Sequence, residues 1–165
     1  MQILVDADSC PRAARALVLR AAERTGIRAV FAANRPVPGI TGKIAVLELC
    51  PQGEGAADNR IVELARRGDL AVTRDIPLAA RLVEAGVSVI DDRGREYTPD
   101  NIREQLSLRN ISVEFALSGL GVERSASYGR KELKAMSDSL DRLLTKLIKE
   151  SPLNGRLQDR GSVSV

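Results

Sequence analysis

The sequence predicts an α/β domain with a mainly parallel five-stranded sheet, helices on both of its faces, and a helical C-terminal extension. Short apolar runs alternate with helical spacing over residues 1–91. Most links between these runs are long enough to hold a helix, as parallel neighbouring strands require. The chain of 165 residues fits one domain. We place that domain at residues 1–150, with C-terminal helices over about 98–150, and expect residues 151–165 to be a disordered tail.

Five apolar runs are the expected strands. The first covers residues 2–6 and ends at Asp6. Its continuous apolar run is typical of a strand that is buried on both faces. The other four cover residues 27–33, 43–50, 69–73 and 87–90. The link between the second and third strands is short and holds two prolines and two glycines, which makes it the weakest candidate for a parallel crossover.

Helical spacing of apolar residues predicts the intervening and C-terminal helices. The first helix covers residues 11–25, with Pro11 at its start and Gly26 after its end. Residues 57–67 and 77–85 give the next two. After the fifth strand we expect a helix over 99–109, another that starts at Asn110 or Ser112 and ends near Gly119, and a last one over 131–149. The last has an apolar stripe that predicts packing on its own domain or on a partner chain.

The composition excludes several classes of site. The chain has no histidine, which rules out a Ser-His-Asp triad, a Cys-His dyad and a histidine-ligated zinc. Four aromatic residues cannot build a base-stacking sheet face. Two cysteines, Cys10 and Cys50, are expected to be small buried thiols rather than a disulfide framework. No signal peptide or membrane-length apolar run is apparent, so we expect a cytoplasmic protein.

Aspartates follow several of the expected strands. Asp6 ends the first strand and Asp8 follows it, Asp58 starts the helix after the third strand, and Asp75 follows the fourth. Asp91 and Asp92 follow the fifth strand. The carboxyl ends of parallel strands share one edge, where ligands bind. Carboxylates that lie close together repel one another unless a cation lies among them, so the pattern predicts Mg²⁺ or Mn²⁺ at this edge.

Other polar residues at the same edge are candidates for binding substrate. Ser9 and Thr73 are expected to bind a phosphate oxygen or a metal-bound water, and Arg12 and Arg74 to contact phosphate.

Each acidic residue also has a structural alternative. Asp8, Ser9 or Asp58 could cap a helix, and Asp75 could fix the turn before Pro77. Asp91 and Asp92 could be solvated turn residues. Asp69 begins its strand at the opposite edge and is expected to be a turn residue.

Four segments resemble the YaiI/YqxD family of bacterial proteins over roughly residues 1–110. They are VDADSCP at 5–11, AADNRIVE at 56–63, GDLAVTRDIPLA at 68–79 and RGREYTPDNI at 93–102. That family is grouped with PIN-like nuclease domains, which have strand order 3-2-1-4-5 and use acids to hold divalent metals that cleave RNA. The resemblance implies that Asp6, Asp8, Asp58 and Asp75, beside Thr73, are the metal-holding and catalytic residues. Asp91 would be a further metal ligand.

The chain departs from the family pattern at two places near its C-terminal part. Family members often have a Gly-Gly-Pro segment before the last helix, where this chain reads ERSASYGRKE. DDRG stands where Asn-Pro-Arg-Gly is usual. Both departures concern the C-terminal part of a substrate groove.

Three functions compete on these observations. The leading one is a metal-dependent phosphodiesterase acting on RNA or another nucleic acid, since carboxylate-bound ions need no histidine. The second is a phosphatase of the haloacid dehalogenase type, with Asp6 as nucleophile and Asp8 as acid and base. That mechanism normally uses a lysine before the late acidic pair, and the chain has none between Lys43 and Lys131. The third is a non-catalytic nucleic-acid or protein-binding module that uses the basic C-terminal region. The net charge of +3 arises there, in residues 123–165.

Overall fold

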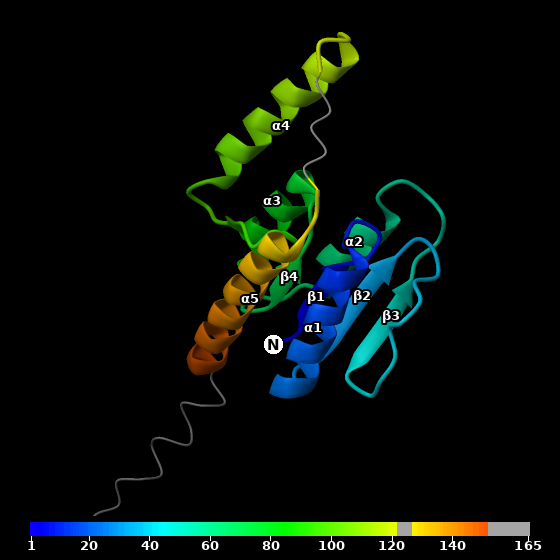
Figure 1. Cartoon of the computed structure of the whole chain (residues 1–165), viewed down its shortest axis with the longest axis vertical. Helices are drawn as coiled ribbons and strands as arrows, with labels where there is room; N and C mark the ends of the chain where they lie inside the picture. The colour runs from blue at the N-terminus through cyan, green and yellow to red at the C-terminus, as the bar shows by residue number, and fades with distance from the viewer. Residues whose placement is uncertain (122–126, 152–165) are drawn as a thin grey trace, which may run out of the picture.

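A computed structural model describes residues 1–121 and 127–151 and shows one six-stranded sheet in the order β3-β2-β1-β4-β5-β6 (Figure 1). The strands are β1 (Ile3–Asp6), β2 (Ala29–Ala33), β3 (Ala45–Leu49), β4 (Leu70–Val72), β5 (Ser88–Ile90) and β6 (Glu96–Tyr97). The first five are parallel, in the predicted order, and β6 is antiparallel to β5. Thus β1 pairs with both β2 and β4 and lies in the middle of the sheet.

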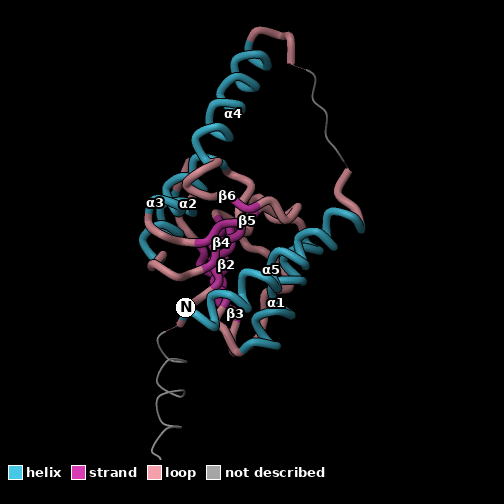
Figure 2. Tube along the Cα trace, turned by 90° about the vertical axis from the view of Figure 1, so that its left-hand side faces the viewer, coloured by secondary structure: helices cyan, strands magenta, loops and turns pink. Residues whose placement is uncertain are grey.

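Two pairs of helices cover the two faces of the sheet (Figure 2). The helices are α1 (Arg12–Thr25), α2 (Ala56–Leu64), α3 (Ile76–Glu84), α4 (Ile102–Leu117) and α5 (Arg130–Glu150). Helices α1 and α5 share one hydrophobic core with Ile3 and Val5 of β1. Helices α2 and α3 share the other core with Leu4, because successive side chains of a strand point to opposite faces. All four residues of β1 are buried, as the continuous apolar run predicts.

Helix α5 packs on its own domain, as one of the two sequence interpretations expects. Its apolar stripe is buried in the core with α1. Gly94, in the turn after β5, lies directly against α5. A Cβ atom there would come within 2.4 Å of the Ala135 carbonyl oxygen, so only glycine allows this approach. The Ser139 hydroxyl also donates to the Gly94 carbonyl (2.7 Å). Helix and turn are therefore held together by both packing and polar contact.

The prediction of two helices over residues 99–119 is wrong. A single helix, α4, runs through Asn110 and Ser112 without a break. The Ser112 hydroxyl donates to the Leu108 carbonyl one turn earlier (2.9 Å), which satisfies the side chain inside the helix. Gly119 ends the helix with a positive φ, and the Leu120 amide donates to the Phe115 carbonyl (3.0 Å). This glycine is the stop signal near which the sequence places the helix end.

Two further expectations concern the edges of the sheet. The link between β2 and β3 does make a parallel crossover, although it contains no helix. Strand β6 was not predicted, because two residues are too few to show a period of two. The expected tail over residues 151–165 lies outside the described residues apart from Ser151. No helix in the described ranges is both long and apolar enough to cross a membrane.

Candidate functional site

An open cavity of about 630 Å³ lies at the carboxyl edge of the sheet. Four carboxylates from four positions along the chain line it: the end of β1, the loop after it, the first turn of α2 and the residue before α3. Its lining is Asp6, Asp8, Ser9, Asn34, Gly55, Ala57, Asp58, Arg74 and Asp75. The structure thus brings together the four aspartates that the sequence places at this edge. Their association follows from the strand order, because β1 lies between β2 and β4.

Asp6 is the most buried of the four carboxylates. One of its oxygens, Oδ2, accepts hydrogen bonds from the Ser9 hydroxyl (2.6 Å) and the Thr73 hydroxyl (3.0 Å). Thr73 directly follows β4 and lies 67 residues from Asp6 in the sequence, and its hydroxyl also accepts from the Asp75 amide (3.0 Å). These bonds fix the orientation of the carboxylate. Ser9 and Thr73 therefore position Asp6, which is a more specific role than the one expected from the sequence.

Asp8 lies in the loop after β1 and turns toward β2. It accepts a hydrogen bond from the Asn34 amide (2.7 Å), and Arg35 lies 3.4 Å from its other oxygen. The Asn34 side chain in turn accepts from the Ala57 amide at the start of α2 (3.2 Å). Sequence reasoning missed Asn34. Its position directly after β2, at the carboxyl end of a central strand, is the signal that could have identified it.

Asp75 and Asp58 stand at the start of two helices on the same face. The Asp75 carboxylate is the N-cap of α3 and accepts from the Leu78 amide (2.8 Å), so its structural role is helix capping beside the turn before Pro77, and the residue also lines the cavity. Asp58 makes no cap bond. Burial raises the pKa of Asp58, and the carboxylates of Asp75 and Asp6 raise it further. The cavity therefore concentrates negative charge that its own residues do not neutralise.

Helix capping was also a candidate role for the loop before α1. The N-cap residue of α1 is Pro11, and it makes no side-chain cap bond. Ser9 instead donates to Asp6, and Asp8 accepts from Asn34. Capping is therefore the wrong explanation for Asp8, Ser9 and Asp58.

Arg74 joins the cavity to a buried carboxylate beside it. The Nε atom of Arg74 lies 3.4 Å from Oδ1 of Asp92. Asp92 is only 1% exposed, whereas about half of the Arg74 side chain is exposed. Within the described ranges neither oxygen of Asp92 accepts a hydrogen bond. Burial raises the pKa of Asp92, and the charge of Arg74 opposes this shift. Asp92 is thus a buried ion-pair partner of Arg74. It is not the solvated turn residue that one interpretation expects.

Three predicted site residues are not part of the cavity lining: Thr73, which hydrogen-bonds Asp6, together with Asp91 and Arg12. The Asp91 carboxylate closes the turn after β5, because its Oδ1 atom accepts from the amides of Arg93 (2.9 Å) and Arg95 (2.8 Å). Asp91 is buried, so it is a turn residue without being a solvated one. Arg12 is exposed on the first turn of α1 and makes no ion pair with the part of the chain that the structure describes.

The oxygen-rich lining can be compared with what a divalent cation requires. Within residues 1–121 and 127–151, no three acidic or cysteine side chains come close enough together to form a ligand cluster by themselves. Mg²⁺ does not need such a cluster, because it keeps several waters and binds proteins through one or two carboxylates. Asp8 Oδ1 is buried without a hydrogen-bond donor from the described residues, and Asp75 has one oxygen outside its cap bond. This donor set fits a hard cation held partly through water.

The two cysteines are buried, as expected. Burial raises the pKa of the Cys10 thiol to about 12, and the nearby Asp92 carboxylate acts in the same direction. Burial also raises the pKa of Cys50. At neutral pH Cys10 is therefore protonated, which removes the thiolate that a cysteine nucleophile requires.

Comparisons with known proteins extend over nearly the whole chain. A family model described as "Uncharacterized BCR, YaiI/YqxD family" matches residues 4–146. A UPF0178 protein of Treponema pallidum is 46% identical over 90% of this chain and 84% of its own length. UPF0178 proteins of Treponema denticola and Myxococcus xanthus are 46% and 41% identical, over 94% and 92% of this chain and 99% of each relative. No solved structure gives a significant match. The chain belongs to the YaiI/YqxD family.

Proposed function

We propose that this member of the YaiI/YqxD family is a divalent-metal-dependent phosphodiesterase that acts on RNA or another nucleic acid. The observation that carries the proposal is the convergence of four aspartates, from four separate positions along the chain, on one open cavity. Folding brings together like charges that repel one another, at a cost that a bound cation would offset. Burial raises the pKa of Asp58, and the carboxylates of Asp75 and Asp6 raise it further, in keeping with that cost.

The residues have distinct roles in this proposal. Asp6, Asp8, Asp58 and Asp75 would together hold Mg²⁺ or Mn²⁺, one or two of them directly and the others through metal-bound water. The bound ion would supply an activated water and neutralise charge on the scissile phosphate. Ser9 and Thr73 hold the Asp6 carboxylate in one orientation through its Oδ2 atom. Arg74, half exposed at the cavity and paired with Asp92, would bind a phosphate oxygen.

The shape of the cavity supports a large polar substrate. Its lining is mostly aspartate, asparagine and small residues, whereas sites for small organic ligands are usually enclosed and apolar. A nucleic-acid strand can cross an open edge and present one phosphate to it.

The C-terminal helix gives less support to a purely binding function. Three of the basic side chains on and beside α5 are already in ion pairs: Lys134 with Asp138, Arg142 with Glu96 and Arg24 with Asp141. These pairs neutralise part of the positive charge on which a phosphate-binding surface depends.

The proposal is tested by incubating purified protein with single-stranded RNA in Mn²⁺, with and without EDTA. We expect cleavage that EDTA abolishes and that Asp75→Asn reduces by at least about 100-fold, since a transition-state interaction is lost. Asparagine can still accept the cap bond from Leu78, so this variant should stay folded. Asp100→Asn, an exposed acidic residue outside the cavity, is the matched control.

The alternatives give different results in the same assays. Hydrolysis of a small phosphate monoester with RNA left intact would favour the phosphatase. Salt-sensitive RNA binding without cleavage of any phosphate ester would favour the binding module. RNA cleavage that persists in Asp75→Asn at the level of Asp100→Asn would show a contaminating nuclease and contradict the proposal.

A further inference from the structure

Arg35 stands beside the cavity at the carboxyl edge and has no role in the function proposed above. It follows Asn34 in the loop after β2, and its side chain is 76% exposed. Its Nε atom lies 3.4 Å from Oδ1 of Asp8. Within the described ranges, Asp8 is the one acid with which Arg35 forms an ion pair. An ion pair with so exposed an arginine contributes little stability, so Arg35 can exchange this partner for another at small cost.

The two oxygens of Asp8 differ in their contacts. Oδ2 accepts a hydrogen bond from the Asn34 amide (2.7 Å). Oδ1 is buried, and no donor in residues 1–121 or 127–151 forms a hydrogen bond with it, although the Arg35 guanidinium is close. Oδ1 is therefore the oxygen of Asp8 that is left for a cation. A cation held there, directly or through water, would repel the guanidinium, because two positive charges would share one oxygen.

The loop at Arg35 allows this exchange by rotation of the side chain alone. Residue 35 precedes Pro36, and a proline ring restricts the residue before it to extended backbone conformations. The restriction lowers the freedom of the backbone at this point, whereas the long, exposed side chain keeps its own freedom. Arg35 can thus leave Asp8 and remain at the same place beside the cavity.

The strand order places Arg35 and Arg74 on opposite sides of the aspartates. Arg35 follows β2 and Arg74 follows β4, and β1, which ends in Asp6, lies between these strands. Strands β2 and β4 are about 10 Å apart, since neighbouring strands are separated by about 4.8 Å. The two guanidinium groups also have separate partners, Asp8 and Asp92. A substrate that contacts both arginines therefore extends across the cavity and needs more than one phosphate group.

We propose that Arg35 binds a second phosphate of the nucleic-acid strand, next to the one that is cleaved, and that it is released for this role when a divalent cation replaces it at Asp8. The inference rests on the proposed function, in which Arg74 contacts the phosphate at the cavity. The cation and the nucleic acid would then bind cooperatively, since each favours the state in which Arg35 has left Asp8.

The first test measures Mn²⁺ binding by isothermal titration calorimetry without nucleic acid. Arg35→Ala removes the competing charge, so we expect it to bind Mn²⁺ about two- to five-fold more tightly than wild type, in line with the strength of an exposed ion pair. Arg28→Ala is the matched control, because Arg28 is an exposed arginine directly before β2, at the opposite edge of the sheet. Thermal melts in EDTA show whether all three proteins are folded.

The outcomes separate this inference from the proposed function. Mn²⁺ affinity that is no higher in Arg35→Ala than in Arg28→Ala would overturn the inference and leave the proposed function standing. A wild type that binds no Mn²⁺ would overturn both.

The second test compares two substrates at saturating Mn²⁺. One is a short single-stranded RNA, and the other is a dinucleoside monophosphate, which has a single phosphate group. We expect Arg35→Ala to lower the preference for RNA, expressed as the ratio of the two kcat/KM values, by about ten-fold, because a charge-assisted hydrogen bond to the second phosphate is lost. Arg28→Ala should keep the wild-type ratio.

Salt dependence identifies the lost contact as one with phosphate. In Arg35→Ala the slope of log KM for RNA against log salt concentration should fall by about 0.7, the value for one phosphate contact on a single strand. Arg35→Lys keeps the positive charge and should keep the wild-type slope. An unchanged substrate ratio or an unchanged slope in Arg35→Ala would contradict the second phosphate contact, even where the wild type cleaves RNA as proposed.

Discussion

The two edges of the sheet each carry an aspartate next to a central strand, and the two residues differ in how completely they are bonded. At the amino edge, Asp69 is buried and accepts hydrogen bonds from the Gln2 amide, the Gln2 side chain and the Arg66 amide, at 2.9–3.0 Å. At the carboxyl edge, the described residues donate to only one carboxylate oxygen of Asp6, which shares its cavity with three more carboxylates. Asp69 therefore has hydrogen-bond donors for both of its oxygens, whereas Asp6 is one of four carboxylates that line a negatively charged cavity.

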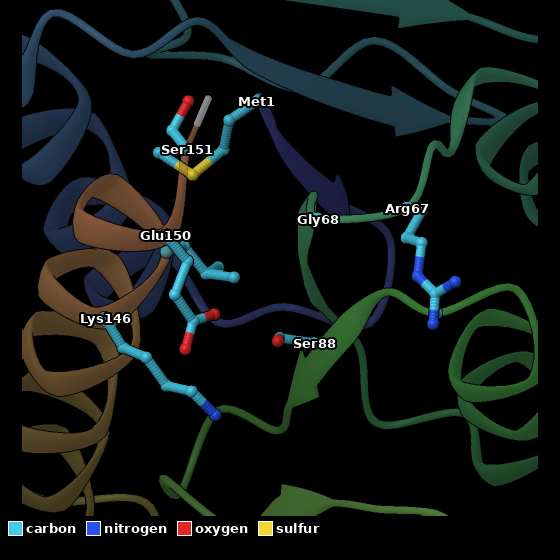
Figure 3. Close-up of a pocket in the computed structure, with 9 residues that line it drawn as sticks. Met1, Arg67, Gly68, Ser88, Lys146, Glu150 and Ser151 are labelled. Carbon is cyan, nitrogen blue, oxygen red and sulfur yellow. The ribbon is translucent and has the colours of Figure 1, made fainter. Parts of the chain in front are cut away.

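The cavities at the two edges show the same difference. The one at the amino edge, about 470 Å³, mixes charges of both signs. Figure 3 shows Lys146 and Glu150 extending from α5 toward Ser88 at the start of β5, with Arg67 on the far side. The carboxyl-edge cavity holds four acids against Arg74. Arg67 and Lys146 outnumber Glu150 by one in the amino-edge cavity, whereas four aspartates outnumber a single arginine by three in the carboxyl-edge cavity, where like-charge repulsion is therefore stronger.

The largest effect should come from Asp69→Ala. The substitution leaves three donors without their acceptor, which should cost about 3 kcal/mol of unfolding free energy, measured by urea denaturation. Asp8→Ala, at the other edge, should cost less than half as much. Equal losses would remove the distinction between the two edges.

A smaller loss should follow Arg74→Ala, which leaves the buried Asp92 carboxylate without its cation. We expect about 1–2 kcal/mol at neutral pH, less than for a fully buried pair because Arg74 is half exposed. Since burial raises the pKa of Asp92, this carboxylate takes up a proton sooner than an ordinary aspartate as the pH falls. The loss should therefore shrink in mildly acidic buffer. A loss that does not depend on pH would show that packing, and not charge, is what Arg74 contributes.

Divalent metal should stabilise the wild type by about 1 kcal/mol when the free ion is five-fold above its Kd, a rise of about 2–4 °C in Tm. Asp6→Asn should lose most of this rise while remaining at least as stable as wild type in EDTA, because asparagine can still accept from Ser9 and Thr73. Asp69→Asn should melt lower throughout yet keep the rise. If metal fails to shift the wild type, the carboxyl edge holds no cation under these conditions and the nuclease proposal loses its support.

The smallest effect should come from Asp58→Asn. Burial and its neighbours raise the folded-state pKa of Asp58 above its usual value of 3.8, so the ionised side chain lowers native stability at neutral pH. In EDTA the variant should melt slightly higher than wild type. That gain should vanish as the pH falls through the folded-state pKa toward the unfolded value, where Asp58 is protonated in both states. Thermal melts at a series of pH values would measure it, and a variant that melts lower at neutral pH would contradict the shift.

Much of the molecule follows from the sequence, for reasons that differ between regions. Buried parallel strands leave continuous apolar runs, so the first five strands could be located. Glycines such as Gly26 mark helix ends. What could not be foreseen depends on contacts between distant residues. The partners of Asp8 and Arg74, namely Asn34 and Asp92, are set by which loops meet at the edge of the sheet. The sequence prediction divided α4 in two because Asn110 and Ser112 are residue types that favour helix starts, whereas both lie inside the helix.

The hydrogen bond between Asp6 and Thr73 joins residues 67 positions apart. A chain leaving the ribosome exposes Asp6 and Asp8 first, Asp58 much later, and Thr73 and Asp75 later still. Until β4 joins β1, the four carboxylates have no common location, and a product released early has no complete site. Whatever chemistry this edge of the sheet performs therefore begins only after the N-terminal half of the protein has been made and folded.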